Sequence, residues 1–157
     1  MRVFIASIEQ IWKEVQVMLS VRFYLIITAI SGLLSVALGA FGAHGLKKLV
    51  SNDMLVAYQT GVQYQFIHTL VLLALTILLL TLPASPGFIR YLKVSANLML
   101  AGILLFSGSL YTMTFMSVAG GLSPTWLGPV TPIGGLIFIL GWAFLAVAAF
   151  KLPVLDS

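Results

Sequence analysis

The placement of charge along this 157-residue chain restricts its fold more than any other feature. Charged side chains are absent from three long stretches, residues 23–46, 54–89 and 94–150. A helix rises ~1.5 Å per residue and a bilayer core is ~30 Å thick, so about 20 apolar residues cross it once. The first two stretches each hold one crossing, and the third is long enough for two. The pattern predicts an all-α integral membrane protein, a four-helix bundle.

The composition agrees with a membrane protein and argues against a nucleic-acid-binding one. Hydrophobic residues make up 61% of the chain and charged residues 8%, whereas soluble domains average about 45–50% and 25%. The net charge of +4 comes from basic residues placed singly or in pairs at the ends of the expected helices. Residues in such places set membrane topology. We therefore expect no nucleic-acid partner.

Turn-forming residues separate the expected membrane spans. Residues 83–87 and 119–129 are rich in proline, glycine and serine and interrupt the apolar pattern. Pro132 is suited to the first turn of the last helix. The bundle is expected to cover residues 22–151, with spans at about 22–43, 54–82, 91–118 and 132–151.

Residues 1–20 differ in character from the rest of the chain. Apolar residues recur there at helical spacing, and most polar residues lie off that stripe. The pattern predicts an amphipathic helix lying in the membrane interface, with Trp12 as an anchor. Two alternatives are a dispensable segment and a true start at Met18. A cleaved signal peptide is disfavoured, because the apolar run of residues 23–43 is too long and three further spans follow.

The basic residues also predict the orientation in the membrane. Six fall on one side of the expected spans and only two, Lys47 and Lys48, on the other. Cytoplasmic loops carry the excess of lysine and arginine, so both termini are expected in the cytoplasm. The six are Arg2, Lys13, Arg22, Arg90, Lys93 and Lys151.

Polar side chains of several spans are expected at a common depth, in the outer half of the membrane. An ionisable residue inside a membrane indicates a site, and His68 on the second span is such a residue. The alternative is that these groups hydrogen-bond between helices, at an average of ~0.6 kcal/mol per contact. For His44, the alternative is a helix cap. Gln59 and Gln63 lie on the opposite helix face, near headgroups and water. The candidate ligand-binding residues are His44, Tyr64, Gln65, His68, Ser107, Ser109 and Tyr111.

The chain offers little of the chemistry that enzymes and metal sites require. It has no cysteine, two histidines and one carboxylate near them, Asp53, whereas metal sites usually take three or four ligands. Ser107 and His68 resemble half of a nucleophilic pair, but no acidic residue is available to orient the imidazole. No cofactor and no metal are therefore expected, and enzymatic activity is the less favoured reading.

Four segments of the sequence together resemble a known family. They are residues 38–46, 58–68 and 106–111, and the pair of segments 131–135 and 141–142. Their order and spacing resemble the small inner-membrane family called domain of unknown function 423, related to transmembrane protein 256 of eukaryotes. The resemblance covers residues 22–151 and implies a four-helix protein of the bacterial cytoplasmic membrane, with no established reaction. The residues before Arg22 depart from the family's usual short start. Family motif positions are matched by His44, Tyr58, Gln59, Tyr64, His68, Ser107, Gly108, Ser109, Tyr111, Thr131 and Pro132.

The expected function is that of a non-enzymatic binding or accessory protein with an outward-facing polar pocket. Its occupant would be a membrane lipid, a quinone-like ring or a partner helix, and a homo-oligomer is a further possibility. The alternative is a small-molecule transporter or proton-linked conduit. That function needs polar groups across the inner half as well, where the chain offers only Thr28, Thr76, Ser95 and Asn97. It also lacks the broken-helix repeats common in transporters.

Overall fold

Helices account for nearly all of the residues that the computed structural model describes, which are 2–81, 85–122 and 124–152. Four helical stretches are long and apolar enough to cross a membrane, and the described residues contain no strand. The predicted all-α, four-span class is thus confirmed. The elements are α1 (Arg2–His44), η1 (Leu46–Lys48), α2 (Asn52–Thr81), α3 (Pro86–Gly102), η2 (Ile103–Ser107), α4 (Gly108–Val118) and α5 (Leu127–Ala149).

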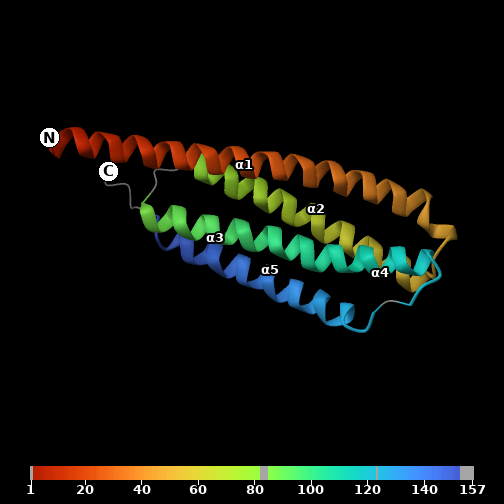
Figure 1. Ribbon diagram of the computed structural model, residues 1–157. Coiled ribbons are helices and arrows are strands. Elements are labelled where there is room, and N and C mark those ends of the chain that lie inside the picture. Colours follow the sequence, from red (N-terminus) through yellow and green to blue (C-terminus); the bar gives the residue numbers. More distant parts are fainter. Residues whose placement is uncertain (1, 82–84, 123, 153–157) are drawn as a thin grey trace.

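The helices alternate in direction and appear as a row in the view of Figure 1. Two contacts also join helices that are not adjacent in this row, Tyr24 of α1 with Asn97 of α3 and His68 of α2 with Phe138 of α5. α1 packs against α2, α2 packs against α3, η2 and α4, and α5 packs mainly against α3 and η2. α1 is therefore an edge helix. The apolar core runs through the middle of the row and includes Tyr24, Leu72, Leu92, Met99 and Phe138.

The third span is not a uniform helix. α3 and α4 are joined by η2, a five-residue π-helix, in which the N–H of Gly108 donates to the carbonyl of Ile103. A π-turn holds one residue more than an α-turn, and such bulges often mark functional sites. The apolar pattern of residues 91–118 gave no sign of this insertion.

Two helix starts differ from the sequence prediction. α3 begins at Pro86, where the Ser85 side chain accepts a hydrogen bond from the N–H of Phe88. A serine cap followed by proline is a strong start signal, which the apolar pattern alone overlooked. α5 begins at Leu127, so Pro132 lies inside this helix and not in its first turn.

The expected boundary between an interfacial helix and the first span is not a break in the backbone. Residues 2–44 form one continuous helix, because residues 2–31 contain neither glycine nor proline to interrupt it. The first part of α1 extends beyond the ends of the other helices (Figure 1). Its apolar side chains there, including Ile5, Ile11 and Trp12, are exposed.

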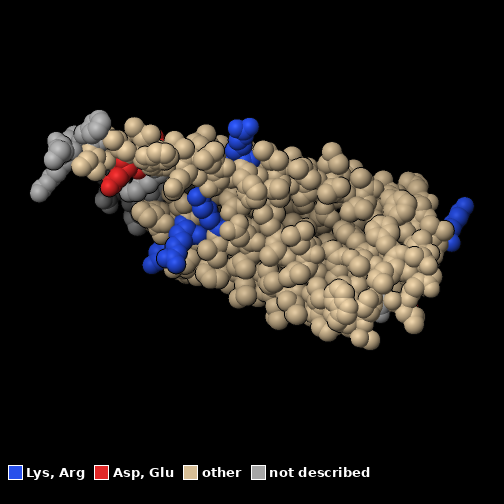
Figure 2. All heavy atoms as spheres, viewed as in Figure 1, with Lys and Arg blue, Asp and Glu red and all other residues tan. Residues whose placement is uncertain are grey.

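Charge lies in two separate regions of the molecule. In Figure 2 one group of basic side chains lies in the left half, inward of the left end, another lies at the right end, and a broad uncharged band separates them. Lys47 and Lys48, in η1, stand at the end opposite the N-terminus. This band has the character of a membrane-crossing surface.

Glycines allow close helix contact at several places, of which Gly134 and Gly42 are two. A Cβ on Gly134 of α5 would lie 2.8 Å from the Cα of Phe106, and one on Gly42 of α1 would lie 2.7 Å from Cε1 of Tyr58. Both distances are shorter than real Cβ contacts. Small residues of this kind bring membrane helices close enough for van der Waals packing and hydrogen bonds between them.

Candidate functional site

A buried hydrogen-bond network centred on Gln65 joins three helices. Its Nε2 donates to the carbonyl of Ser31 at 3.0 Å, and its Oε1 accepts from the hydroxyl of Tyr111 at 2.8 Å. Gln65 is buried, and both ends of its amide have partners. α1, α2 and α4 are therefore tied together by a single side chain.

The direction of each hydrogen bond in this network follows from the available protons. Thr69 donates its one hydroxyl proton to the carbonyl of Gln65 at 2.7 Å. The contact between the Ser31 and Thr69 hydroxyls, 2.6 Å long, must then use the proton of Ser31. Since a carbonyl only accepts, the Ser31 carbonyl also fixes which end of the Gln65 amide faces it. The network thus has one consistent arrangement, which favours a structural role.

A second tyrosine closes the network toward the η1 end. Tyr58 is fully buried, and its hydroxyl donates to the carbonyl of Leu38 in α1 at 2.8 Å. Its ring lies 5.2 Å from that of Tyr111 and fills the space left by Gly42. Tyr58 was not among the predicted site residues, although it matched a family motif position.

His68 lies outside this network, in an aromatic cluster between α2 and α5. Its ring stacks on Phe138 with a centroid distance of 3.5 Å, and Tyr64 and Trp142 lie 5.7 Å and 6.4 Å away. Tyr64 also stacks on Phe106 at 4.5 Å. The cluster packs α2 on α5 and η2, with His68 buried and Tyr64 exposed at the outside.

The hydrogen bonding of His68 fixes the tautomer of its neutral ring. Nδ1 lies 2.8 Å from the carbonyl of Tyr64, one turn earlier in α2. A carbonyl only accepts, so Nδ1 carries the proton and Nε2 is left as an acceptor. Nε2 has no hydrogen-bond partner among the described residues. His68 therefore combines a structural contact with one unused acceptor.

The two predicted serines of the third span have different surroundings. Ser109 donates to the carbonyl of Phe106 at 2.9 Å, so the 2.7 Å contact with Thr131 uses the proton of the threonine. Ser107 is fully buried in η2, and its hydroxyl has no hydrogen-bond partner among the described residues. Ser109 thus links α4 to α5, whereas Ser107 makes no such link.

His44 does not join the other predicted residues. It is exposed at the last position of α1, two residues beyond Gly42, which packs on Tyr58. Tyr58 and His68 are ten residues apart in α2, which corresponds to ~15 Å. A shared pocket for the two histidines is therefore not formed.

The hydrogen-bond network around Gln65 meets α1 near the middle of the expected first span. Ser31 is nine residues from Arg22 and thirteen from His44, which correspond to ~14 Å and ~20 Å along the helix. Gln65 and Thr69 stand level with Ser31 through their hydrogen bonds. The depth of these groups in the membrane stays a prediction. A residue count along one helix does not show which residues of a neighbouring helix stand level with it.

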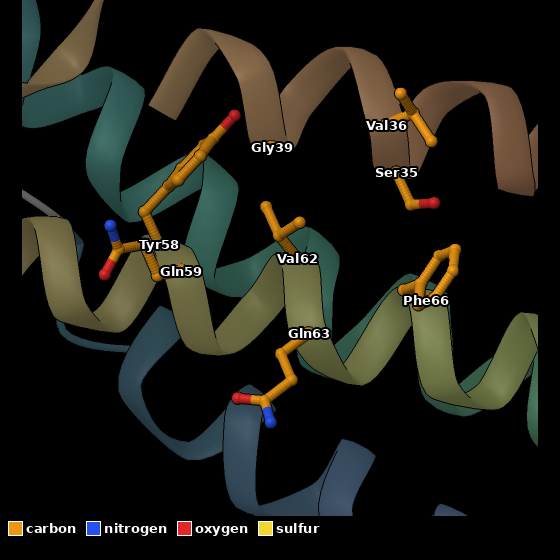
Figure 3. A pocket seen from close by; sticks show the side chains of 8 residues that line it. All are labelled: Ser35, Val36, Gly39, Tyr58, Gln59, Val62, Gln63 and Phe66. Atoms are coloured by element: carbon orange, nitrogen blue, oxygen red, sulfur yellow. The ribbon is translucent and has the colours of Figure 1, made fainter. Parts of the chain in front are cut away.

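A hollow lies away from these residues, between α1 and α2. It has a volume of about 270 Å³ and is lined by Ser35, Val36, Gly39, Tyr58, Gln59, Val62, Gln63 and Phe66. Figure 3 shows Val62 directed at Gly39 of α1, whereas Gln63, which also lines the hollow, extends from α2 away from α1. No described residue hydrogen-bonds to either glutamine side chain. Of the predicted residues, none lines this groove.

The described residues also contain no group of three or more potential metal ligands. The aromatic cluster holds a single histidine, and the Gln65 network contains only neutral amide, hydroxyl and carbonyl groups. Helix packing and weak polar binding are the chemistry that this arrangement supports.

The fold and these contacts define a multi-pass helical membrane protein whose buried polar groups mostly bond within and between its own helices. Residues 38–135 match the family described as protein of unknown function (DUF423), and the chain belongs to this family. It is 40% identical to the UPF0382 membrane protein YwdK of Bacillus subtilis over 130 residues, 83% of this chain and 98% of that protein.

Two further relatives cover a similar part of the chain. A UPF0382 membrane protein of Haemophilus influenzae is 40% identical over 128 residues, 82% of this chain and 94% of the relative. The inner membrane protein YgdD of Escherichia coli K12 is 39% identical over 131 residues, 83% of this chain and 92% of the relative. No solved structure matches the chain.

Removing the Tyr111 hydroxyl should weaken the helix bundle. We expect Tyr111→Phe to lower the free energy of unfolding by about 0.5–1.5 kcal/mol, because the Gln65 amide oxygen loses its partner. Unfolding in mixed lipid and detergent micelles would measure this. Thr112→Val is the matched control, since the exposed Thr112 hydroxyl bonds only within its own helix. Equal effects of the two substitutions would contradict a structural role for the network.

His68 should tolerate an apolar ring but not a small side chain. We expect His68→Ala to lower the free energy of unfolding by ~3–5 kcal/mol, as for large-to-small changes in cores. His68→Phe keeps the stack on Phe138 and should cost no more than ~1.5 kcal/mol, the value of one hydrogen bond. The same unfolding assay compares them. If both variants were equally unstable, the ring nitrogens would matter more than the packing.

Proposed function

We propose that this protein is a non-enzymatic membrane protein that holds a glycerolipid in the groove between α1 and α2. The groove supports this proposal because its floor is apolar and its rim carries two unpaired amides, Gln59 and Gln63. Amide groups exposed to hydrocarbon are costly unless they find polar partners. A lipid offers both an acyl chain for the floor and ester oxygens for the amide N–H groups.

The position and size of the groove suit one lipid chain. The hydroxyl of Tyr58 reaches the carbonyl of Leu38, which lies six residues before the end of α1, or ~9 Å along the helix. The neighbouring Gln59 is thus near the membrane surface, at the depth of lipid ester groups. A volume of about 270 Å³ is below the usual ~300–1,000 Å³ of small-molecule pockets. The groove fits part of a chain and not a bulky ring system.

A transporter or conduit has less support. Most of the buried polar side chains bond to one another or to nearby carbonyls, as Thr76 does to Leu72 and Ser95 to Gly141. Among the described residues they form short separate links, within one helix for Thr76 and between α3 and α5 for Ser95. Groups that are already paired offer no continuous path for an ion or a polar solute.

The proposed location is the bacterial cytoplasmic membrane, with both termini in the cytoplasm. The name of the Escherichia coli relative supports an inner membrane, and the excess of basic residues near the N-terminal end of the bundle supports the orientation.

Filling the groove should reduce lipid retention. We expect Gly39→Leu to lower the amount of co-purified phospholipid several-fold, because its side chain enters the groove beside Val62, 3.4 Å from the new Cβ. Native mass spectrometry of the full chain in mild detergent would count bound lipids. Ala40→Leu adds the same side chain at an exposed neighbouring position and should retain the lipid. A folded Gly39→Leu variant with unchanged lipid would reject the proposal, and loss of a protein partner instead would indicate a helix as the occupant.

Reporter fusions would test the orientation. With a cytoplasmic C-terminus, green fluorescent protein fused after Ser157 should fluoresce and alkaline phosphatase should be inactive. Alkaline phosphatase inserted after Leu49, in the opposite loop, should be active and serves as the control. The reverse pattern would place both termini outside the cytoplasm.

A further inference from the structure

An apolar stripe on the first part of α1 has no cover within the molecule. Ile8, Ile11, Val15 and Met18 are 39%, 59%, 41% and 57% exposed. The first buried residue of α1 is Val21, and Val17, one turn earlier, is partly buried against the core. Contiguous exposed apolar side chains of this kind mark an interaction surface.

The spacing of the stripe is that of a helix pair. Its residues follow one another at intervals of three, four and three, the alternation that keeps one seam facing a partner helix in a coiled coil. Trp12 and Leu19 flank this seam and are also exposed, which widens the apolar face. Arg22 occupies the next seam position after Met18, so the apolar stripe ends there. In a pair of identical helices the two Arg22 side chains would face each other at this position.

The charge and the stiffness of this part of α1 favour a protein cover over a lipid cover. Its two acidic residues, Glu9 and Glu14, balance Arg2 and Lys13, whereas helices that lie on membranes are usually rich in basic residues and bind anionic lipids. Lying on the surface also requires a bend near residue 20. Glycine and proline are absent from residues 2–31, and α1 is continuous there.

We infer that a second copy of this chain covers the stripe, with the two α1 helices packed in parallel. Insertion with the same topology places both copies of α1 in the same orientation. Confinement to one membrane also raises their effective concentration, so a seam of about two heptads can associate although it would be too short in free solution. The pair is independent of the groove between α1 and α2, because the groove lies in the span and the stripe precedes it.

Disulfide cross-linking tests this pairing directly, because the native chain has no cysteine. Single-cysteine variants of the full chain would be oxidised in native membranes, and dimers would be counted on non-reducing gels. We expect Ile8→Cys, Ile11→Cys and Val15→Cys to form dimers at least several-fold more than Glu9→Cys and Gln16→Cys, which lie off the seam. Adding Val15→Lys to Ile8→Cys should abolish the cross-link, whereas adding Val15→Ile should keep it.

Two results would overturn the inference. Equal dimer formation at all five positions would indicate random collision. Absence of dimers at the seam positions would also reject the pair, and quenching of Trp12 by brominated lipids, in a Trp126→Phe and Trp142→Phe background, would then show that lipid covers the stripe. With the pair formed, Trp12 should be quenched much less than a tryptophan within the span.

Discussion

The bundle depends on hydrogen-bond partners for the buried side-chain amide of Gln65, because water does not reach it. An unpaired amide in hydrocarbon is costly, so Gln65 of α2 is compatible with the fold only while Ser31 and Tyr111 hold its two ends. This requirement fixes the register of α1 and α4 against α2 more sharply than apolar packing does, because leucine and lipid are similar in polarity. The stacked aromatic cluster around His68 and Phe138 does the same for α5. Polar and aromatic contacts therefore determine how the helices are aligned along one another.

Much of the fold could be predicted from the sequence, because membrane thickness and the exclusion of charge act on each span separately. The number of spans and their approximate limits followed from the uncharged stretches. The start of α3 at Pro86 and the π-helix η2 did not, since both arise from local hydrogen bonding that the apolar pattern does not record.

The candidate site was harder to predict, because it depends on which helices are neighbours and in what register. Gln65 and Tyr111 do meet, but His68 packs among aromatic rings and His44 lies at the end of α1. The partners Ser31 and Thr69 were overlooked as members of the site, although Thr69 lies one turn from Gln65. The groove was missed because it is defined by a gap between α1 and α2. The exposed position of Gln59 and Gln63 was the one sequence signal that pointed to it.

The extra residue in η2 lets the two halves of the third membrane-spanning helix pack against different neighbouring helices. Each residue advances an α-helix by ~100°, so one inserted residue rotates all that follows by about that angle. On one side of the insertion, α3 packs chiefly on α5, and on the other, α4 packs chiefly on α2. A regular helix would present the same stripe along its whole length and would leave Tyr111 turned away from Gln65. The π-helix thus sets the rotation of α4 relative to α3, and shortening it by one residue would turn the whole of α4 toward other neighbours.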